Sequence, residues 1–124
     1  MNLRSGSSQA LADALCAADE DIMFCAVVSI GAEILATSAK KGADTFIPES
    51  KVRLFVRRWD LVRKIDDTAD EFMGPTESVA VFRSKMTLVS VNLSNGGCAL
   101  MGARPSFDPT RVKALERVAR SSLG

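Results

Sequence analysis

The nine residues 22–30, IMFCAVVSI, form a nearly continuous apolar run that contains several β-branched side chains. A run of this length, bounded by acidic residues and a glycine, is typical of a strand that is buried on both faces. A strand of this kind needs packed layers on both of its sides, which strongly constrains the fold. Residues 31–33 predict a turn, and residues 34–40 predict a more polar returning strand, so the two strands form a hairpin.

The rest of the chain alternates between helical and strand-like patterns. Gly74-Pro75 supplies a helix stop after the long middle segment, and Asp108 is suited to cap the last helix. Asn95-Gly96 favours a two-residue type I′ turn between two strands, because both positions of that turn need positive φ. The expected elements are helix 9–18, strands 22–30 and 34–40, helix 49–73, strands 78–83, 86–93 and 98–103, and helix 109–123.

This order, α-β-β-α-β-β-β-α, is an α+β pattern. We predict a single sandwich-like α/β domain with a five-stranded antiparallel sheet, helices on its faces and a long middle helix. The length of 124 residues fits one compact domain. Residues 1–8 are short and polar and predict a flexible N-terminus, so the domain is expected to comprise residues 9–124.

Charge and cysteine content argue against several classes of protein. The chain has 16 basic and 15 acidic residues, whereas nucleic-acid-binding domains usually carry a clear positive excess. Cys16, Cys25 and Cys98 are odd in number and widely spaced, which predicts buried thiols rather than disulfides or a zinc site. Neither a signal-peptide pattern nor an apolar run of membrane-spanning length occurs. We therefore expect a cytoplasmic protein that binds neither nucleic acid nor membrane.

The residue types that most often carry catalysis are missing. The sequence contains no histidine and no tyrosine, so it lacks the commonest general base and any Ser-His-Asp or Cys-His arrangement. Asp66, Asp67, Asp70 and Glu71 spread around a helix and have no accompanying calcium-binding loop, so a solvated helix face explains them better than a metal site. We expect no enzymatic activity, no cofactor and no metal.

The middle segment 49–73 is apolar over an unusually wide arc. Helical geometry spreads its apolar side chains over about 220°, whereas covering one sheet face needs little more than about 100°. The arc contains Val52, Leu54, Phe55, Val56, Trp59, Leu61, Val62 and Ile65. This width predicts a second apolar partner, namely another chain, unless the two other helices cover the excess.

Charge is also segregated along this segment. Residues 51–71 contain six basic and five acidic side chains, the basic ones mostly in the N-terminal half and the acidic ones mostly in the C-terminal half. Two copies packed antiparallel would place each basic half against the acidic half of the other. Asp60–Lys64 and Arg63–Asp67 have the i, i+4 spacing of helical ion pairs.

The element order and several local patterns resemble the Roadblock/dynein light chain family, whose fold is related to longin and profilin domains. The hairpin AVVSIGAEILATSA (26–39) is similar to the first hairpin of that family, and the meander ending LVSVNLSNGGCALMGA (88–103) follows the long helix in the same order. The resemblance covers residues 9–122. It extends to archaeal proteins of this architecture.

The resemblance implies a non-catalytic module that forms a homodimer, or a heterodimer with a homologous domain. Such dimers serve as platforms or regulators for small Ras-like GTPases or as adaptors in signalling complexes. The implied dimer surface consists of Val52, Phe55, Val56, Trp59 and Arg63 of the middle helix together with Val79, Val81 and Arg83 of the following strand. Two alternatives remain open at this point: a small-molecule sensor resembling PAS or GAF domains, and nucleic-acid binding through Arg53, Arg57 and Lys64.

Overall fold

The computed structural model describes residues 3–43, 49–66 and 69–123. Five antiparallel strands form one sheet in the order β2-β1-β5-β4-β3. Its elements are α1 (Leu3–Ala18), β1 (Ile22–Val28), β2 (Ile34–Ala39), α2 (Glu49–Asp66), α3 (Asp70–Met73), β3 (Ser78–Phe82), β4 (Thr87–Asn92), β5 (Cys98–Ala103), the 3-10 turn η3 (Pro109–Arg111) and α4 (Val112–Leu123). The predicted α+β class, element order and five-stranded sheet are confirmed.

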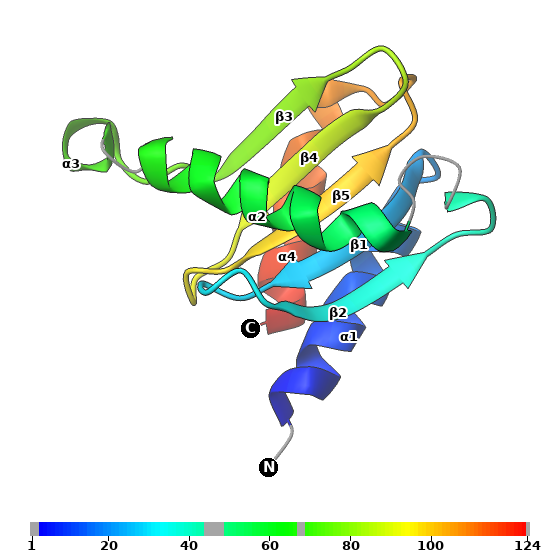
Figure 1. The fold of residues 1–124 in the computed structure, drawn as a ribbon, viewed down its shortest axis with the longest axis horizontal. Helices are drawn as coiled ribbons and strands as arrows, with labels where there is room; N and C mark the ends of the chain where they lie inside the picture. Colours follow the sequence, from blue (N-terminus) through cyan, green and yellow to red (C-terminus); the bar gives the residue numbers. More distant parts are fainter. Residues whose placement is uncertain (1–2, 44–48, 67–68, 124) are drawn as a thin grey trace.

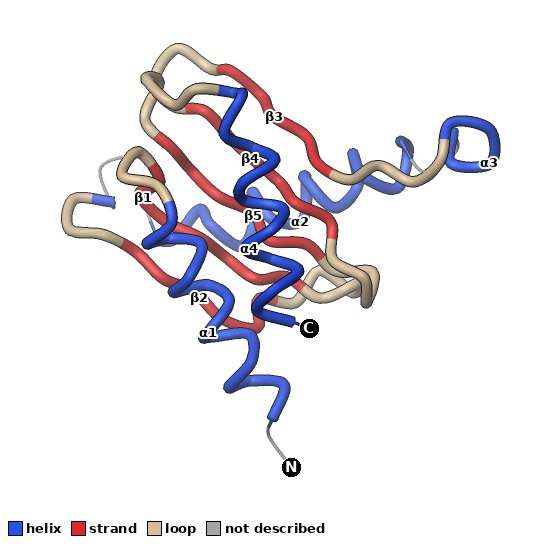
Figure 2. The backbone as a smooth tube through the Cα atoms, turned by 180° about the vertical axis from the view of Figure 1, so that it is seen from behind, coloured by secondary structure: helices blue, strands red, loops and turns tan. Residues whose placement is uncertain are grey.

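Helices cover both faces of this sheet. Figure 1 shows α2 crossing one face, and Figure 2 shows α1 and α4 on the other. Two clusters of buried side chains result, one between the sheet and α1 with α4, and one between the sheet and α2. β1 lies between β2 and β5 and is buried along nearly its whole length, as its apolar sequence predicts.

The strands are up to two residues shorter at their ends than expected, and the helices differ from the sequence-based expectation in three places. α1 begins at Leu3, so the segment 1–8 that was expected to be flexible is helical from that residue on. The single helix expected over 49–73 ends at Asp66, and a separate four-residue helix, α3, follows it. The closing helix starts as a 3-10 turn at Pro109, where the Asp108 carboxylate accepts a hydrogen bond from the Thr110 amide at 2.9 Å, as expected of an N-cap.

The β4–β5 hairpin is confirmed, but its predicted type I′ turn is wrong. The Gly96 amide donates to the Leu93 carbonyl at 3.1 Å, and the Leu93 amide donates to the Gly97 carbonyl at 2.9 Å, so the loop contains three residues. Gly96 has a φ of 90°. Asn95 does not have a positive φ, because Ala32 is the only non-glycine residue with positive φ among the described residues. The turn therefore needs a left-handed backbone at the glycine alone, because the loop is one residue longer than expected.

Candidate protein-interaction surface

The inner side of α2 packs on the sheet and belongs to the core. Val56 and Trp59 are 2% and 9% exposed, and Val52 and Phe55 are partly buried in the same cluster. The Phe55 and Trp59 rings lie 6.2 Å apart in a tilted arrangement. Four of the residues implied as dimer contacts therefore hold α2 on its own sheet, and Val56 and Trp59 present almost no surface to a partner.

Arg63, also implied as a dimer contact, is engaged within its own chain. One guanidinium nitrogen, Nη2, donates to the Gly96 carbonyl at 3.0 Å, and Nη1 lies 3.6 Å from the Asp60 carboxylate. Its side chain is only 16% exposed. Arg63 thus ties α2 to the β4–β5 turn. Lys64 forms the expected ion pair with Asp60 at 3.0 Å, whereas the expected Arg63–Asp67 pair lies outside the described residues.

The outward side of α2 carries uncovered apolar side chains. Leu54, Leu61 and Val62 are 57%, 62% and 58% exposed, and these three residues are called the outer face of α2 below. The alternative that other helices cover this part of the arc is wrong, because α1 and α4 pack on the opposite face of the sheet. Large side chains grouped in this way on a helix mark a surface for a partner.

β3 is an edge strand, and its outer side is open. Within the described residues it pairs with β4 alone, so one row of its backbone donors and acceptors faces away from the sheet. Val79 and Val81 are half-buried against the α2 cluster, whereas Phe82 is 59% exposed and Arg83 is exposed. The structure places these implied contact residues at an edge that can accept another strand, which is one general way in which proteins recognise each other.

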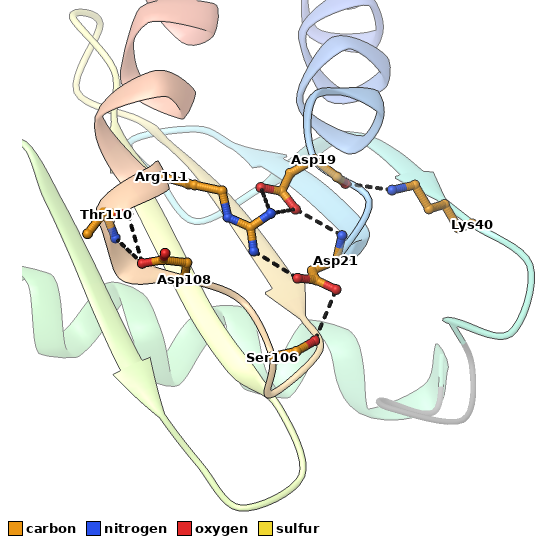
Figure 3. A network of polar contacts seen from close by, with 7 residues as sticks. All are labelled: Asp19, Asp21, Lys40, Ser106, Asp108, Thr110 and Arg111. Atoms are coloured by element: carbon orange, nitrogen blue, oxygen red, sulfur yellow. Dashed lines mark hydrogen bonds and ion pairs between the residues drawn. The ribbon is translucent and has the colours of Figure 1, made fainter.

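A cluster of polar side chains, which the sequence patterns did not reveal, lies at the end of α1 (Figure 3). Arg111 donates to the carboxylates of Asp19 and Asp21 at 2.9 and 2.8 Å, and its guanidinium lies 5.1 Å from the centre of the Phe107 ring. The hydrogen bond from Arg111 to Asp21, together with one from the Ser106 hydroxyl at 3.0 Å, keeps the pKa of Asp21 below its usual range. The cluster joins residues about ninety positions apart and thereby fastens the start of α4 to the α1–β1 connection.

No group of potential metal ligands occurs among the described residues. All three cysteines are buried, as predicted, and burial raises the pKa of the Cys25 thiol well above its usual range. A surface hollow of about 720 Å³ lies between α2, α4 and the β4–β5 turn. Glu77, in its wall, lies 3.6 Å from Arg120, which also lines the hollow, and 3.1 Å from Lys113, which does not. The hydrogen bond from Lys113 lowers the pKa of Glu77.

Solved structures with the same architecture identify the fold. MglB from Myxococcus xanthus matches with a TM-score of 0.77 at 10% identity, covering 99% of this chain and 89% of that one. The Roadblock/LC7 domain from Streptomyces avermitilis matches with a TM-score of 0.68 at 13% identity, covering 93% and 90%. The gliding protein MglB from Thermus thermophilus matches with a TM-score of 0.71 at 9% identity, covering 98% and 94%.

This chain has the Roadblock/LC7 fold. No protein-family model matches the sequence, and no curated protein is significantly similar to it, so the three-dimensional structure carries this assignment. The similar structures do not favour the PAS- or GAF-like alternative for this Roadblock-like domain. In the part of the chain that the structure describes, no helix has the length and apolarity needed to cross a bilayer.

Proposed function

We propose that this Roadblock-like domain is a cytoplasmic, non-catalytic module that dimerises and acts as a scaffold or regulator for a small Ras-like GTPase. The observation that carries the proposal is the outer face of α2, where Leu54, Leu61 and Val62 are each more than half exposed. The exposed part of these side chains remains in contact with water in the single chain, whereas a second α2 would bury it.

The arrangement of the outer face suits a two-fold symmetric dimer. Such a dimer uses the same patch on both copies, so a patch must be complementary to itself. An antiparallel pair of α2 helices meets this condition for the apolar outer face. Within α2 itself the charges are not divided into two halves, because Arg63 and Lys64 lie in its last turn, and the acidic residues Asp70 and Glu71 follow only in α3. The free edge of β3 allows the two sheets to continue into each other in the same assembly.

The comparisons support self-association by analogy of fold. One of the similar structures is MglB with a tetrameric arrangement, which matches with a TM-score of 0.68 at 11% identity. MglC from Myxococcus xanthus also matches, with a TM-score of 0.59 at 14% identity. A homologous domain is therefore the second kind of partner to consider, and the link to small GTPases rests on the Roadblock resemblance.

Sedimentation velocity tests the dimer directly. The wild-type protein is expected to sediment as a dimer at low micromolar concentration, and a monomer at about 100 μM would contradict the proposal. Substitution of Trp59 is unsuitable for this test: Trp59 is buried in its own chain, so Trp59→Glu would unfold the domain rather than separate two copies.

The regulatory part needs a separate measurement. A small Ras-like GTPase, loaded with GDP or with a non-hydrolysable GTP analogue, is titrated with the dimer by calorimetry. Binding that favours one nucleotide state is expected of a regulator, because a partner shifts an equilibrium only by its differential affinity for the two states. Equal binding to both states would leave a scaffold role and contradict regulation.

A further inference from the structure

α3 is a four-residue helix that contributes no residue to either cluster of buried side chains. None of its residues, Asp70–Met73, is buried. Phe72 and Met73 are 80% and 74% exposed, more than any other large hydrophobic side chain among the described residues. Both views show α3 projecting beyond the end of α2, away from the sheet (Figures 1 and 2).

A helix this short gains little stability from its own backbone hydrogen bonds. Gly74, with a φ of 78°, ends it through an amide hydrogen bond to the Asp70 carbonyl at 3.0 Å. The result is a defined turn that presents two adjacent apolar side chains, Phe72 and Met73, next to two carboxylates, Asp70 and Glu71. This combination suits a surface that is both apolar and basic.

The N-terminal half of α2 offers such a surface. Leu54 is 57% exposed, and Lys51 and Arg58, three residues before it and four after it, are exposed on the same side of the helix. Arg53 and Arg57 are exposed as well. In an antiparallel pair of α2 helices, the C-terminal end of each helix lies beside the N-terminal half of the other, and α3 continues from that C-terminal end.

We propose that α3 of one copy docks on the N-terminal half of α2 of a second copy of this chain. Phe72 and Met73 cover Leu54, while Asp70 and Glu71 face Lys51 and Arg58. The inference rests on the proposed dimer and extends the contact between the outer faces, at Leu54, to α3 and to the basic residues Lys51 and Arg58. An anionic lipid surface is a poorer occupant, because the two carboxylates beside the apolar pair would be repelled by it.

The first test removes the apolar anchor. Phe72→Ser is expected to raise the dissociation constant of the dimer about tenfold for each contact between α3 and the partner's α2. A two-fold dimer contains this contact twice, so the total increase is about a hundredfold. Leu35→Ser, which changes a side chain 40% exposed on the opposite edge strand, is the matched control and leaves the constant unchanged. Sedimentation equilibrium measures both constants, and circular dichroism confirms that both variants fold.

The second test exchanges charges. The double variant Asp70→Lys/Glu71→Lys and the double variant Lys51→Glu/Arg58→Glu each weaken the homodimer at low salt. Mixing the two variants pairs opposite charges at both contacts of the heterodimer, and combining all four substitutions in one chain does the same in a homodimer. Each arrangement is expected to restore the affinity to within about threefold of the wild type. Arg117→Glu, on α4 at the other face of the sheet, serves as the charge control.

The outcomes separate this inference from the function on which it rests. A wild-type monomer overturns both. A dimer whose dissociation constant is unchanged by Phe72→Ser, or one that the four-fold charge exchange fails to restore, overturns the docking of α3 and leaves the dimeric module intact. Weakening by Phe72→Ser together with restoration by the charge exchange supports the contact.

Discussion

Leu61→Ala measures how much the outer face of α2 contributes to self-association. Complete burial of a leucine side chain stabilises by about 1.5–3 kcal/mol. Because 62% of Leu61 is still exposed in the single chain, a dimer interface that covers it would gain about 1–2 kcal/mol per copy. A two-fold dimer contains Leu61 twice, so the substitution is expected to cost about 2–4 kcal/mol and to raise the dissociation constant about 30- to 900-fold.

The assay is sedimentation equilibrium on the wild type and the variant over the same concentration range. Urea denaturation of the two proteins at a concentration where both are monomeric should give nearly the same free energy of unfolding, because Leu61 contributes little to its own core. Leu35→Ala at the opposite edge of the sheet is the control for loss of an exposed apolar group. A wild-type dimer whose dissociation constant is unaffected by Leu61→Ala would refute the assignment of this face.

Three further predictions follow from packing and charge. Gly102→Ala places a Cβ against Cε1 of the Phe24 ring, so it should destabilise by about 1–3 kcal/mol in urea denaturation, and less in a Phe24→Ala background where the ring is gone. Equal costs in the two backgrounds would contradict the clash. The Arg111 hydrogen bond lowers the pKa of Asp21 in the folded state, so this stabilisation is complete above the unfolded value of about 3.9 and is lost as the pH falls through the lower folded value. In Asp21→Asn the free energy of unfolding should therefore fall less steeply as the pH is lowered. An unchanged fall at acid pH would argue against the Arg111–Asp21 pair. Arg63→Met removes a charged hydrogen bond to the β4–β5 turn and should lower the free energy of unfolding by about 1–3 kcal/mol, while a loss of dimer affinity alone would show that Arg63 acts on the partner.

Local sequence patterns predicted the elements well because each is set by neighbouring residues. The strand predicted over residues 22–30 forms over 22–28, and Asp108 caps the last helix as predicted. Gly74 ends a helix at the predicted place, but that helix is α3 and not the long α2. The end of α2 at Asp66 did not follow from the pattern, since helical spacing continues through Met73. The loop of the β4–β5 hairpin was also missed, because a turn of two residues and a turn of three share the same Asn-Gly signal.

The candidate surface was predicted only in part. The pattern shows that α2 has more apolar surface than one sheet face can cover, but periodicity does not say which side of the arc meets the sheet. Val56 and Trp59, which are among the contacts that the family resemblance implies, are buried against the sheet, whereas Leu54 and Leu61 of the same arc are exposed. Contacts over a long sequence separation decide that orientation, among them the hydrogen bond from Arg63 to the β4–β5 turn.

The amino-acid order therefore specifies the helices, the strands, the absence of histidine-based chemistry and the excess width of one apolar arc, since all of these depend on composition or on residues close together in the chain. The pairing of β1 with β5, the clamp of Arg111 on Asp19 and Asp21, and the rotation of α2 on the sheet arise only when distant segments meet. Burial divides the arc of α2 into a core side and a free side. That division, which no local pattern encodes, produces the surface on which the proposed function rests.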